Sequence, residues 1–176
     1  MTHHHDTDIQ PAKFLLENID LLPVGRALDI AMGSGRNAIY LASMGFEVEG
    51  IDIFPEAIQN ALESAQKAGV TIKAEVADLQ GSYDIRQEYY DVIICFNYLQ
   101  RSLIPCIKDG VRKGGVIVYE TFIVDQAQLF GKPKNPDYLL KHNELLDMFR
   151  EFRCLRYREG VIGNRAALAG IVAQKV

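Results

Sequence analysis

Apolar residues recur along the chain with two spacings, one typical of helices and the other typical of strands. Runs with apolar side chains three and four residues apart predict helices, and these runs cover residues 12–22, 37–44, 55–68, 102–109 and 143–150. Short apolar or alternating runs predict strands, and these cover residues 26–31, 46–51, 70–77, 91–96, 116–121, 152–158 and 166–173. The run at 91–96 is the most apolar, so we expect it at the centre of a sheet.

The order of these elements predicts the fold class. Strands alternate with helices over most of the chain, which indicates a parallel sheet with helices on both faces. No helix separates the last two predicted strands, so we expect them to pair as an antiparallel hairpin. The predicted fold is an α/β, Rossmann-like, doubly wound sheet of seven mostly parallel strands. Residues 122–137 break the periodicity and contain Gly131, Pro133 and Pro136, which predicts an irregular surface excursion.

The length of the chain indicates how many domains it forms. A chain of 176 residues fits one domain, because domains commonly have about 100–200 residues. We expect a single domain over 12–176, preceded by a disordered or tag-like stretch at 1–11 that contains a run of three histidines, His3, His4 and His5.

Charge and cysteine usage limit the classes of partner. The net charge of −4 argues against a nucleic-acid partner. No apolar run is long enough to span a membrane, and no signal peptide is visible. Cys95, Cys106 and Cys154 are an odd number without a CxxC spacing, which favours reduced thiols in a cytoplasmic protein and no metal site. The oligomeric state stays open between a monomer and a weak dimer.

Candidate chemistry begins where the first predicted strand gives way to a helix. Gly33 and Gly35 lie at this junction, where glycine allows positive φ and close approach of a ligand to the backbone. The following helix N-terminus offers free N–H groups to a carboxylate or phosphate. An ordinary strand-to-helix turn also uses glycine, so the pair alone does not establish a ligand site.

Three acidic residues strengthen the ligand interpretation. Asp29, Asp52 and Asp78 lie at the ends of three consecutive predicted strands. Ligands of open α/β sheets bind beyond the carboxyl ends of the strands, where a carboxylate can accept hydrogen bonds from ribose hydroxyls. Asp52 could instead cap the helix that begins near Pro55. Together the three acids predict a nucleoside site.

Two classes of cofactor compete for this site. Residues 33–38 (GSGRNA) fit the dinucleotide pattern G-x-G-x-x-A with Asp52 as the ribose acid, so an NAD(P)-dependent oxidoreductase is a real alternative. Asp29 would place negative charge near a pyrophosphate, whereas it suits the ammonium of an aminoacyl group. The chain also lacks room for a substrate domain and closes its sheet with a hairpin. S-adenosyl-L-methionine is therefore the better fit.

The segment GSGRNAIYLASMGFEVEGID resembles the tellurite-resistance-type methyltransferases, within the class I S-adenosylmethionine-dependent methyltransferases. Their first motif usually reads acid-x-Gly-x-Gly-x-Gly, and this chain has Ala31 in place of the first glycine. This departure is mild, because the one methyl group of alanine can be absorbed if φ stays negative. The resemblance implies S-adenosyl-L-homocysteine as product and a set of cofactor-binding residues: Asp29, Ala31, Gly33, Gly35, Asn37, Asp52, Ile53, Asp78, Leu79 and Phe96.

The acceptor side is expected after the fourth and fifth predicted strands. The catalytic candidates by position are Asn97, Tyr98, Arg101 and Glu120. Arg101 could bind an anionic substrate or be a solvated helix residue. Glu120 could be a general base, needed only if the nucleophile starts protonated, or an ordinary polar residue at a strand end.

Further acceptor-side features are Tyr98 with Phe122, residues 124–138 and His142. Tyr98 and Phe122 could line an aromatic pocket or cover the cofactor. Residues 124–138 have the length and composition of an active-site lid, or of a packed loop. His142 is expected to face solvent.

The connection between the last two strands departs from the resembled family. Residues 159–165 (EGVIGNR) are short and contain no histidine, leaving Arg165 as the obvious candidate there. Tellurite is therefore not implied as the substrate. We expect a methyltransferase for a small-molecule or small inorganic nucleophile, such as a chalcogen oxyanion or thiol. A non-catalytic S-adenosylmethionine-binding module is the other alternative.

Overall fold

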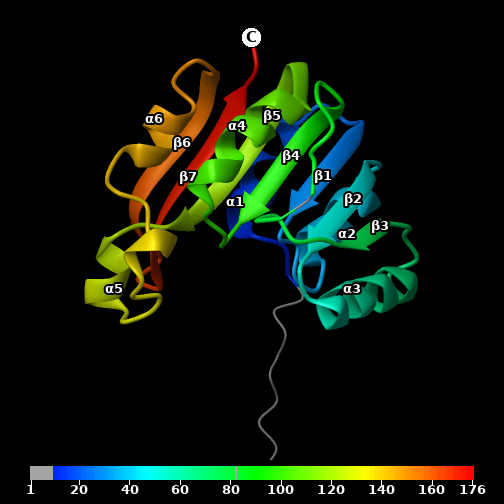
Figure 1. Ribbon diagram of the computed structural model, residues 1–176, viewed down its shortest axis with the longest axis horizontal. Coiled ribbons are helices and arrows are strands. Elements are labelled where there is room, and N and C mark those ends of the chain that lie inside the picture. The colour runs from blue at the N-terminus through cyan, green and yellow to red at the C-terminus, as the bar shows by residue number, and fades with distance from the viewer. Residues whose placement is uncertain (1–9, 82) are drawn as a thin grey trace, which may run out of the picture.

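Seven strands form one sheet in the computed structural model, which describes residues 10–81 and 83–176 (Figure 1). The order across the sheet is β3-β2-β1-β4-β5-β7-β6. The strands are β1 (Arg26–Ile30), β2 (Glu47–Asp52), β3 (Lys73–Val76), β4 (Tyr90–Phe96), β5 (Val111–Phe122), β6 (Arg153–Ile162) and β7 (Ala166–Gln174). The predicted α/β doubly wound fold is confirmed.

The pairing of the strands creates a point where the chain reverses direction across the sheet. Strands β1 to β5 pair in parallel, whereas β7 pairs antiparallel with both β5 and β6. The chain proceeds outward from β1 to β3 and then returns to place β4 on the other side of β1. In such sheets the crevice at the reversal, beyond the carboxyl ends of the strands, is where ligands bind.

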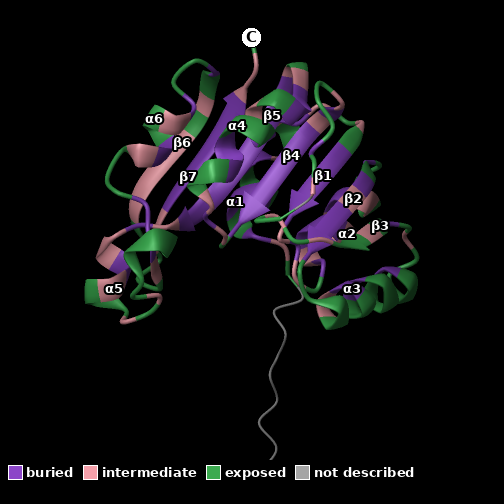
Figure 2. Cartoon of the chain, in the orientation of Figure 1, coloured by how far each residue is buried: buried purple, intermediate pink, exposed green. Residues whose placement is uncertain are grey.

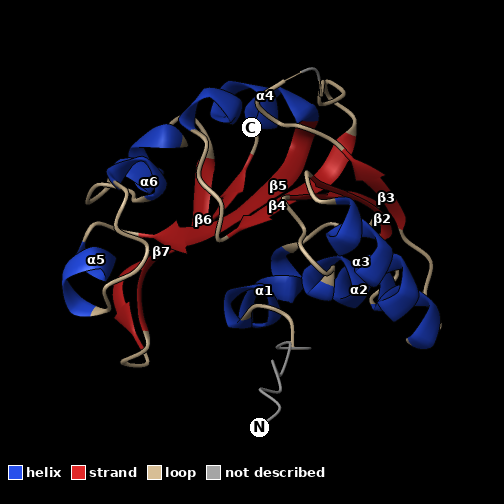
Figure 3. Ribbon diagram, turned by 60° about the horizontal axis from the view of Figure 1, so that its bottom comes forward, coloured by secondary structure: helices blue, strands red, loops and turns tan. Residues whose placement is uncertain are grey.

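Helices cover both faces of the sheet. Figure 3 shows α1, α2 and α3 on one side and α4 and α6 on the other. The helices are α1 (Lys13–Asn18), α2 (Arg36–Ser43), α3 (Pro55–Lys67), α4 (Ile104–Gly110), α5 (Asp125–Leu129) and α6 (Glu144–Met148), with short 3₁₀ turns η1 (Ile19–Leu21), η2 (Arg101–Leu103) and η3 (Pro136–Tyr138).

The sheet separates two hydrophobic cores, and β4 contributes to both. Ile93 and Cys95 pack on the side of α4 and α6, whereas Val92, Ile94 and Phe96 pack on the side of α1 to α3. All five side chains are buried, as the buried strands at the centre of Figure 2 illustrate. A strand covered on both faces needs a continuous apolar run rather than alternation, which is why 91–96 is so apolar.

Two segments differ in detail from the sequence prediction. The excursion after β5 contains α5 and η3, where only irregular structure was expected, and β5 begins at Val111 rather than at residue 116. Most of the predicted disordered stretch, residues 1–9, lies outside the described residues. Among the residues that the structure describes, no helix has both the length and the apolar character needed to cross a membrane.

Candidate functional site

The loop between β1 and α2 lines the candidate site. Its residues Ala31, Gly33 and Gly35 have φ values of 54°, 57° and 84°. A side-chain carbon at Gly35 would lie 2.8 Å from Cβ of Ala61 in α3, so glycine also allows close helix packing. The condition of a negative φ at Ala31 is not met: the loop imposes the left-handed conformation that glycine tolerates, and alanine adopts it with strain.

Asp29 lies in β1 directly before this loop and is almost fully buried. Among the residues that the structure describes, its Oδ2 atom has no hydrogen-bond partner. Burial raises the pKa of Asp29 to about 8, although a backbone hydrogen bond from Ala38 and the charge of Arg36 act in the opposite direction. A buried acceptor without a partner is costly, so the position suits a positively charged ligand group that would pair with it.

Asp52, at the end of β2, holds the glycine loop in place. Its Oδ2 accepts a hydrogen bond of 2.9 Å from the Gly33 N–H, and its Oδ1 accepts one of 3.0 Å from the Phe54 N–H. A carboxylate has about four acceptor positions, so two remain for a ligand. Asp52 therefore orders the chain before α3 and faces a pocket. It does not cap the helix as the alternative expects, because the N-cap is Phe54 and no side-chain cap hydrogen bond is present there.

The pocket beside Asp52 has a volume of about 280 Å³ and is called the outer pocket here. Ile53 and Phe54 at its edge expose 51% and 67% of their surface, which leaves apolar area available to a flat ligand. The outer pocket is lined by Ala31, Asp52, Ile53, Phe54, Ala77, Asp78, Leu79, Gln80 and Tyr98.

A second pocket of about 250 Å³ surrounds the glycine loop and is called the glycine pocket. It shares Ala31 with the outer pocket. In this pocket the Oδ1 atom of Asn37 accepts a hydrogen bond of 2.8 Å from the Ala12 N–H. The glycine pocket is lined by Asp29, Ala31, Met32, Gly33, Ser34, Arg36, Asn37, Phe96 and Asn97.

A third and larger hollow of about 650 Å³ lies next to the glycine pocket and is called the basic pocket. The two share Arg36, Phe96 and Asn97, so the three pockets follow one another along the carboxyl edge of the sheet. The basic pocket is lined by Ala12, Lys13, Arg36, Phe96, Asn97, Glu120, Phe122, Arg158, Ile162, Gly163, Arg165, Ala166 and Leu168.

An ion pair forms one wall of the basic pocket. Glu120 of β5 accepts hydrogen bonds of 3.2 and 3.0 Å from Nε and Nη2 of Arg158 in β6. Burial raises the pKa of Glu120, and the neighbouring Arg158 partly offsets that effect. The guanidinium also contacts Glu17 at 3.2 Å and lies 4.7 Å from the ring centre of Phe14. These contacts hold the Arg158 side chain in one orientation.

Arg101 is placed differently from the other acceptor-side candidates. Its guanidinium donates to both carboxylate oxygens of Glu144, at 2.6 and 3.0 Å, and to the carbonyls of Asp137 and Leu139. It lines none of the three pockets. The contacts instead connect the end of the excursion to α6.

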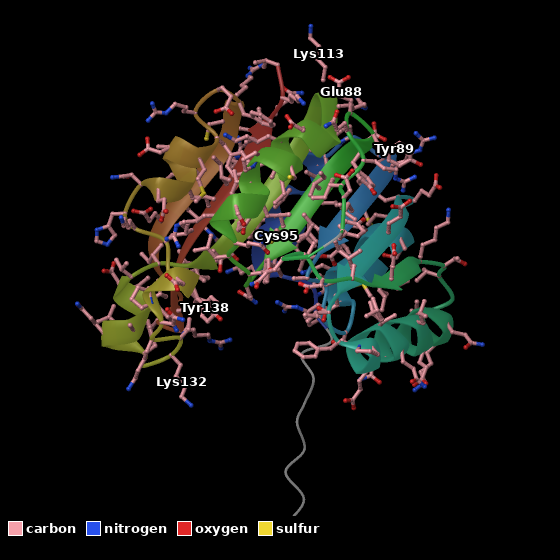
Figure 4. The ribbon with its side chains drawn as sticks, viewed as in Figure 1. Glu88, Tyr89, Cys95, Lys113, Lys132 and Tyr138 are labelled. Atoms are coloured by element: carbon pink, nitrogen blue, oxygen red, sulfur yellow. The ribbon has the colours of Figure 1, made fainter. Side chains whose placement is uncertain are left out.

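Other features of the excursion also lie at the site end of the molecule. Figure 4 shows Lys132 and Tyr138 at the end of the molecule where the parallel strands finish, away from Glu88, Tyr89 and Lys113 at the opposite end. His142 is exposed, as expected, and pairs with Asp125 at 3.1 Å.

The predicted residues therefore gather, with few exceptions, along one edge. The predicted cofactor residues line the outer or glycine pocket, except Gly35, which belongs to the loop between them. Asn97 lies between the glycine and basic pockets, Tyr98 lines the outer pocket and Glu120 the basic pocket.

Two residues that shape the site through side-chain hydrogen bonds, Gln100 and Arg158, were absent from the sequence prediction. Gln100 accepts a hydrogen bond of 2.6 Å from the Tyr98 hydroxyl and donates one of 3.1 Å to the Leu79 carbonyl, so it joins two sides of the outer pocket. Arg158 lines the basic pocket from β6, the edge strand of the sheet. Neither belongs to a motif, and strand pairing alone brings Arg158 to Glu120.

Comparison with known proteins gives a consistent family. The model of the family described as tellurite resistance protein TehB matches residues 3–166. Hemagglutinin 1 of Eikenella corrodens is 26% identical over 145 residues, which cover 77% of this chain and 46% of that protein. A probable S-adenosyl-L-methionine-dependent methyltransferase TehB of Haemophilus influenzae is 26% identical over 144 residues, covering 77% of this chain and 49% of that protein.

A solved structure shows the same fold. The crystal structure of TehB from Haemophilus influenzae aligns with a TM-score of 0.79 at 22% identity, covering 94% of this chain and 63% of that chain. The chain spans about half the length of the curated relatives it matches.

Proposed function

We propose, from the premise that this chain belongs to the family of tellurite resistance protein TehB, that it is an S-adenosyl-L-methionine-dependent methyltransferase. The acceptor is a small-molecule or small inorganic nucleophile, with a thiol or a chalcogen oxyanion among the candidates. The unpartnered carboxylate oxygen of Asp29 beside the glycine loop is the observation that carries the proposal.

The residues of the glycine pocket fit the amino acid end of this cofactor. The aminoacyl group carries an ammonium, which would satisfy Oδ2 of Asp29 and remove the cost of a buried acceptor without a partner. The left-handed loop at Gly33 leaves open space beside the backbone, since a side-chain carbon there would have no atom of the described residues within 4 Å except its chain neighbours. A dinucleotide would instead bring a pyrophosphate toward Asp29, so an NAD(P)-dependent reductase is not favoured.

The residues of the outer pocket fit the nucleoside end. Asp52 has acceptor positions left for ribose hydroxyls after its two backbone hydrogen bonds. Ile53 would cover a face of the adenine. The Asp78 carboxylate, with one oxygen 2.9 Å from the Gln80 N–H, would accept from the adenine amine together with the backbone at Leu79.

The chain's own part in the reaction is to orient and to exclude water. When bound, S-adenosyl-L-methionine supplies a methyl group on a sulfonium, which a nucleophile displaces in line. Phe96 and Asn97 lie between the glycine and basic pockets, where they would align the acceptor. Positioning of this kind supplies up to about 7–11 kcal/mol. Glu120 would take a proton only from an acceptor that enters protonated.

A thermal-shift comparison tests this proposal. The chain is measured with S-adenosyl-L-homocysteine, S-adenosyl-L-methionine, NAD(H) and NADP(H). Ligand at about 100 times its dissociation constant adds roughly 2.7 kcal/mol, which raises the midpoint of a domain of this size by about 5–11 °C. A shift with the two adenosyl sulfur compounds alone is expected. A shift with the dinucleotides alone, or with none of the four, would contradict the proposal.

Variants locate the binding site. Asp29→Asn and Asp52→Asn are expected to reduce the shift with S-adenosyl-L-homocysteine. Asp20→Asn is the matched control, because Asp20 is exposed and lies in η1, away from the pockets. Methyl transfer to a panel of thiols and chalcogen oxyanions then separates an enzyme from a binding module without turnover.

A further inference from the structure

We infer that the basic pocket binds an organic anion, an apolar body carrying a carboxylate or phosphate group, as the methyl acceptor. This inference rests on the proposed function, because it concerns the acceptor side of the same site. It restricts the acceptor to organic anions and excludes a bare inorganic oxyanion.

The charge of the pocket lining selects for an anion. Among the described residues of its lining, four side chains are cationic, Lys13, Arg36, Arg158 and Arg165, and one is acidic, Glu120. Glu120 and Glu17 balance the charges of Arg158 and Lys13, and Arg165 adds a further positive charge to the lining. A hollow lined by one sign of charge raises the local concentration of ligands with the opposite sign.

Size and apolar area select for an organic body. The volume of about 650 Å³ falls in the range of about 300–1,000 Å³ that is typical of pockets for small organic ligands. A water molecule occupies only about 30 Å³, and an inorganic oxyanion is a few times larger. The apolar side chains of Phe96, Phe122, Ile162 and Leu168 also line the pocket, and a bare oxyanion would leave them without contacts.

Arg158 is the group best prepared to recognise the acidic head. Glu120 and Glu17 use three of its five N–H donors. The guanidinium is held in place by these contacts and by the ring of Phe14, and its side chain remains 24% exposed. A fixed guanidinium loses little freedom when it binds a carboxylate or phosphate, so Arg158 would determine specificity.

Saturation-transfer NMR with four probes of similar shape tests the inference. Benzoate and phenyl phosphate carry the acidic head, benzyl alcohol is neutral and benzylamine is a cation. Each is titrated into the free protein and into the protein loaded with S-adenosyl-L-homocysteine. We expect one or both anions to bind at least about tenfold more tightly than benzyl alcohol, and the ratio of the two anions identifies the preferred head. Sodium sulfate at equal concentration should displace neither.

Variants assign the binding to the basic pocket. The double variant Glu120→Gln/Arg158→Gln removes both charges of the ion pair, keeps the size of the Glu120 side chain and leaves a shorter polar side chain at 158. It should weaken binding of the preferred anion about tenfold. Lys13→Gln, at a side chain 77% exposed, gives a smaller loss without risk to the fold. Arg156→Gln is the matched control, because Arg156 is an exposed arginine of the same strand outside the pocket.

Three results would overturn the inference: benzyl alcohol binding as tightly as the anions, sulfate displacing them, or undiminished anion binding by the double variant. The two proposals fail separately. Absence of S-adenosyl-L-homocysteine binding contradicts the proposed methyltransferase, whereas the probe titrations of the free protein still decide whether the pocket selects an organic anion.

Discussion

Glu120 and Arg158 form an ion pair across β7, the strand that lies between the two strands that carry them. Gly170 of β7 is in register with both residues. A side-chain carbon at Gly170 would lie 3.0 Å from Oε2 of Glu120 and 3.0 Å from the Phe14 ring. Because Gly170 has no side chain, the side chains of Glu120 and Arg158 can reach each other across β7.

Removing one member of this pair should destabilise the fold. Arg158→Ala leaves the buried Glu120 carboxylate without its partner, which costs about 1–3 kcal/mol in free energy of unfolding. The double variant Glu120→Gln/Arg158→Gln should recover part of that loss, because no buried charge remains. Urea denaturation measures both, and an unchanged midpoint for Arg158→Ala would contradict the role of the pair.

Gly170→Ala tests whether the fold needs the space beside Gly170 that the ion pair and Phe14 occupy. The added methyl group meets Glu120 and Phe14 at 3.0 Å, so the expected cost is about 1–3 kcal/mol from overpacking. Combining it with Phe14→Leu should lower the additional cost, since the leucine leaves room. If Gly170→Ala is as stable as the parent protein in thermal denaturation, the close approach is not a constraint.

Ala31→Gly should stabilise the protein. Ala31 has a φ of 54°, and a left-handed backbone costs a non-glycine residue about 1–2 kcal/mol. The more flexible unfolded chain of the glycine variant offsets about 0.4–1 kcal/mol of that relief. A net gain of about 0.5–1 kcal/mol is expected in urea denaturation. Ala38→Gly, inside α2, is the control and should destabilise.

Binding of S-adenosyl-L-homocysteine should depend on pH through Asp29. Its carboxyl group has a pKa of about 8 in the free protein, so an ammonium must bind to a carboxylate that is partly protonated at neutral pH. Affinity should rise as pH increases toward 8, by at most about tenfold per unit. Titration calorimetry at pH 6, 7 and 8 measures this rise, and Asp29→Asn should abolish it. An affinity independent of pH in the parent protein would refute the assignment.

The raised pKa of Asp29 also predicts that the stability of the free protein falls as pH rises, opposite to the predicted rise in ligand affinity. Because folding raises the pKa of Asp29 from 3.8 to about 8, the folded state binds more protons than the unfolded state between these values. The contribution of Asp29 to the free energy of unfolding is therefore greatest below pH 4 and is lost as pH rises toward 8. Asp29→Asn should show a smaller loss of stability over this range.

Arg101→Ala should loosen the excursion after β5. Arg101 binds Glu144 and the carbonyls of Asp137 and Leu139, so its loss should lower hydrogen-exchange protection over residues 124–142. Arg150→Ala is the control, because that arginine and its partner Asp147 are mostly exposed and such pairs contribute little. Reduced methyl transfer with unchanged exchange would favour the alternative in which Arg101 contacts the substrate.

The fold was predictable where the apolar pattern was strong. The run at 91–96 became the central strand, and the absence of a helix after residue 152 correctly predicted the hairpin of β6 and β7. The acids at three strand ends came together because parallel strands end at one edge of the sheet. Their positions in the sequence were therefore sufficient to predict that they line adjoining pockets at one edge, whereas the nucleoside site itself stays a prediction.

Other features depended on contacts that no local pattern encodes. The φ of Ala31 is set by the loop around it rather than by alanine's own preference. The pairing of Arg158 with Glu120 depends on the order of β5, β7 and β6 and on Gly170 between them. Gln100 joins Tyr98 to Leu79 through hydrogen bonds between loops. No sequence motif indicates such a role for a glutamine.

The order of the pockets along the sheet has a consequence for how such a protein diversifies. The outer and glycine pockets draw most of their lining from the half of the chain that contains β1 to β3, whereas the basic pocket draws heavily on β5 and on the β6–β7 hairpin. Phe96 and Asn97 lie at the boundary. Substitutions in the hairpin can therefore reshape the basic pocket while the lining of the other two pockets stays constant. Under the proposed function, new acceptor specificities could then evolve without rebuilding the cofactor site.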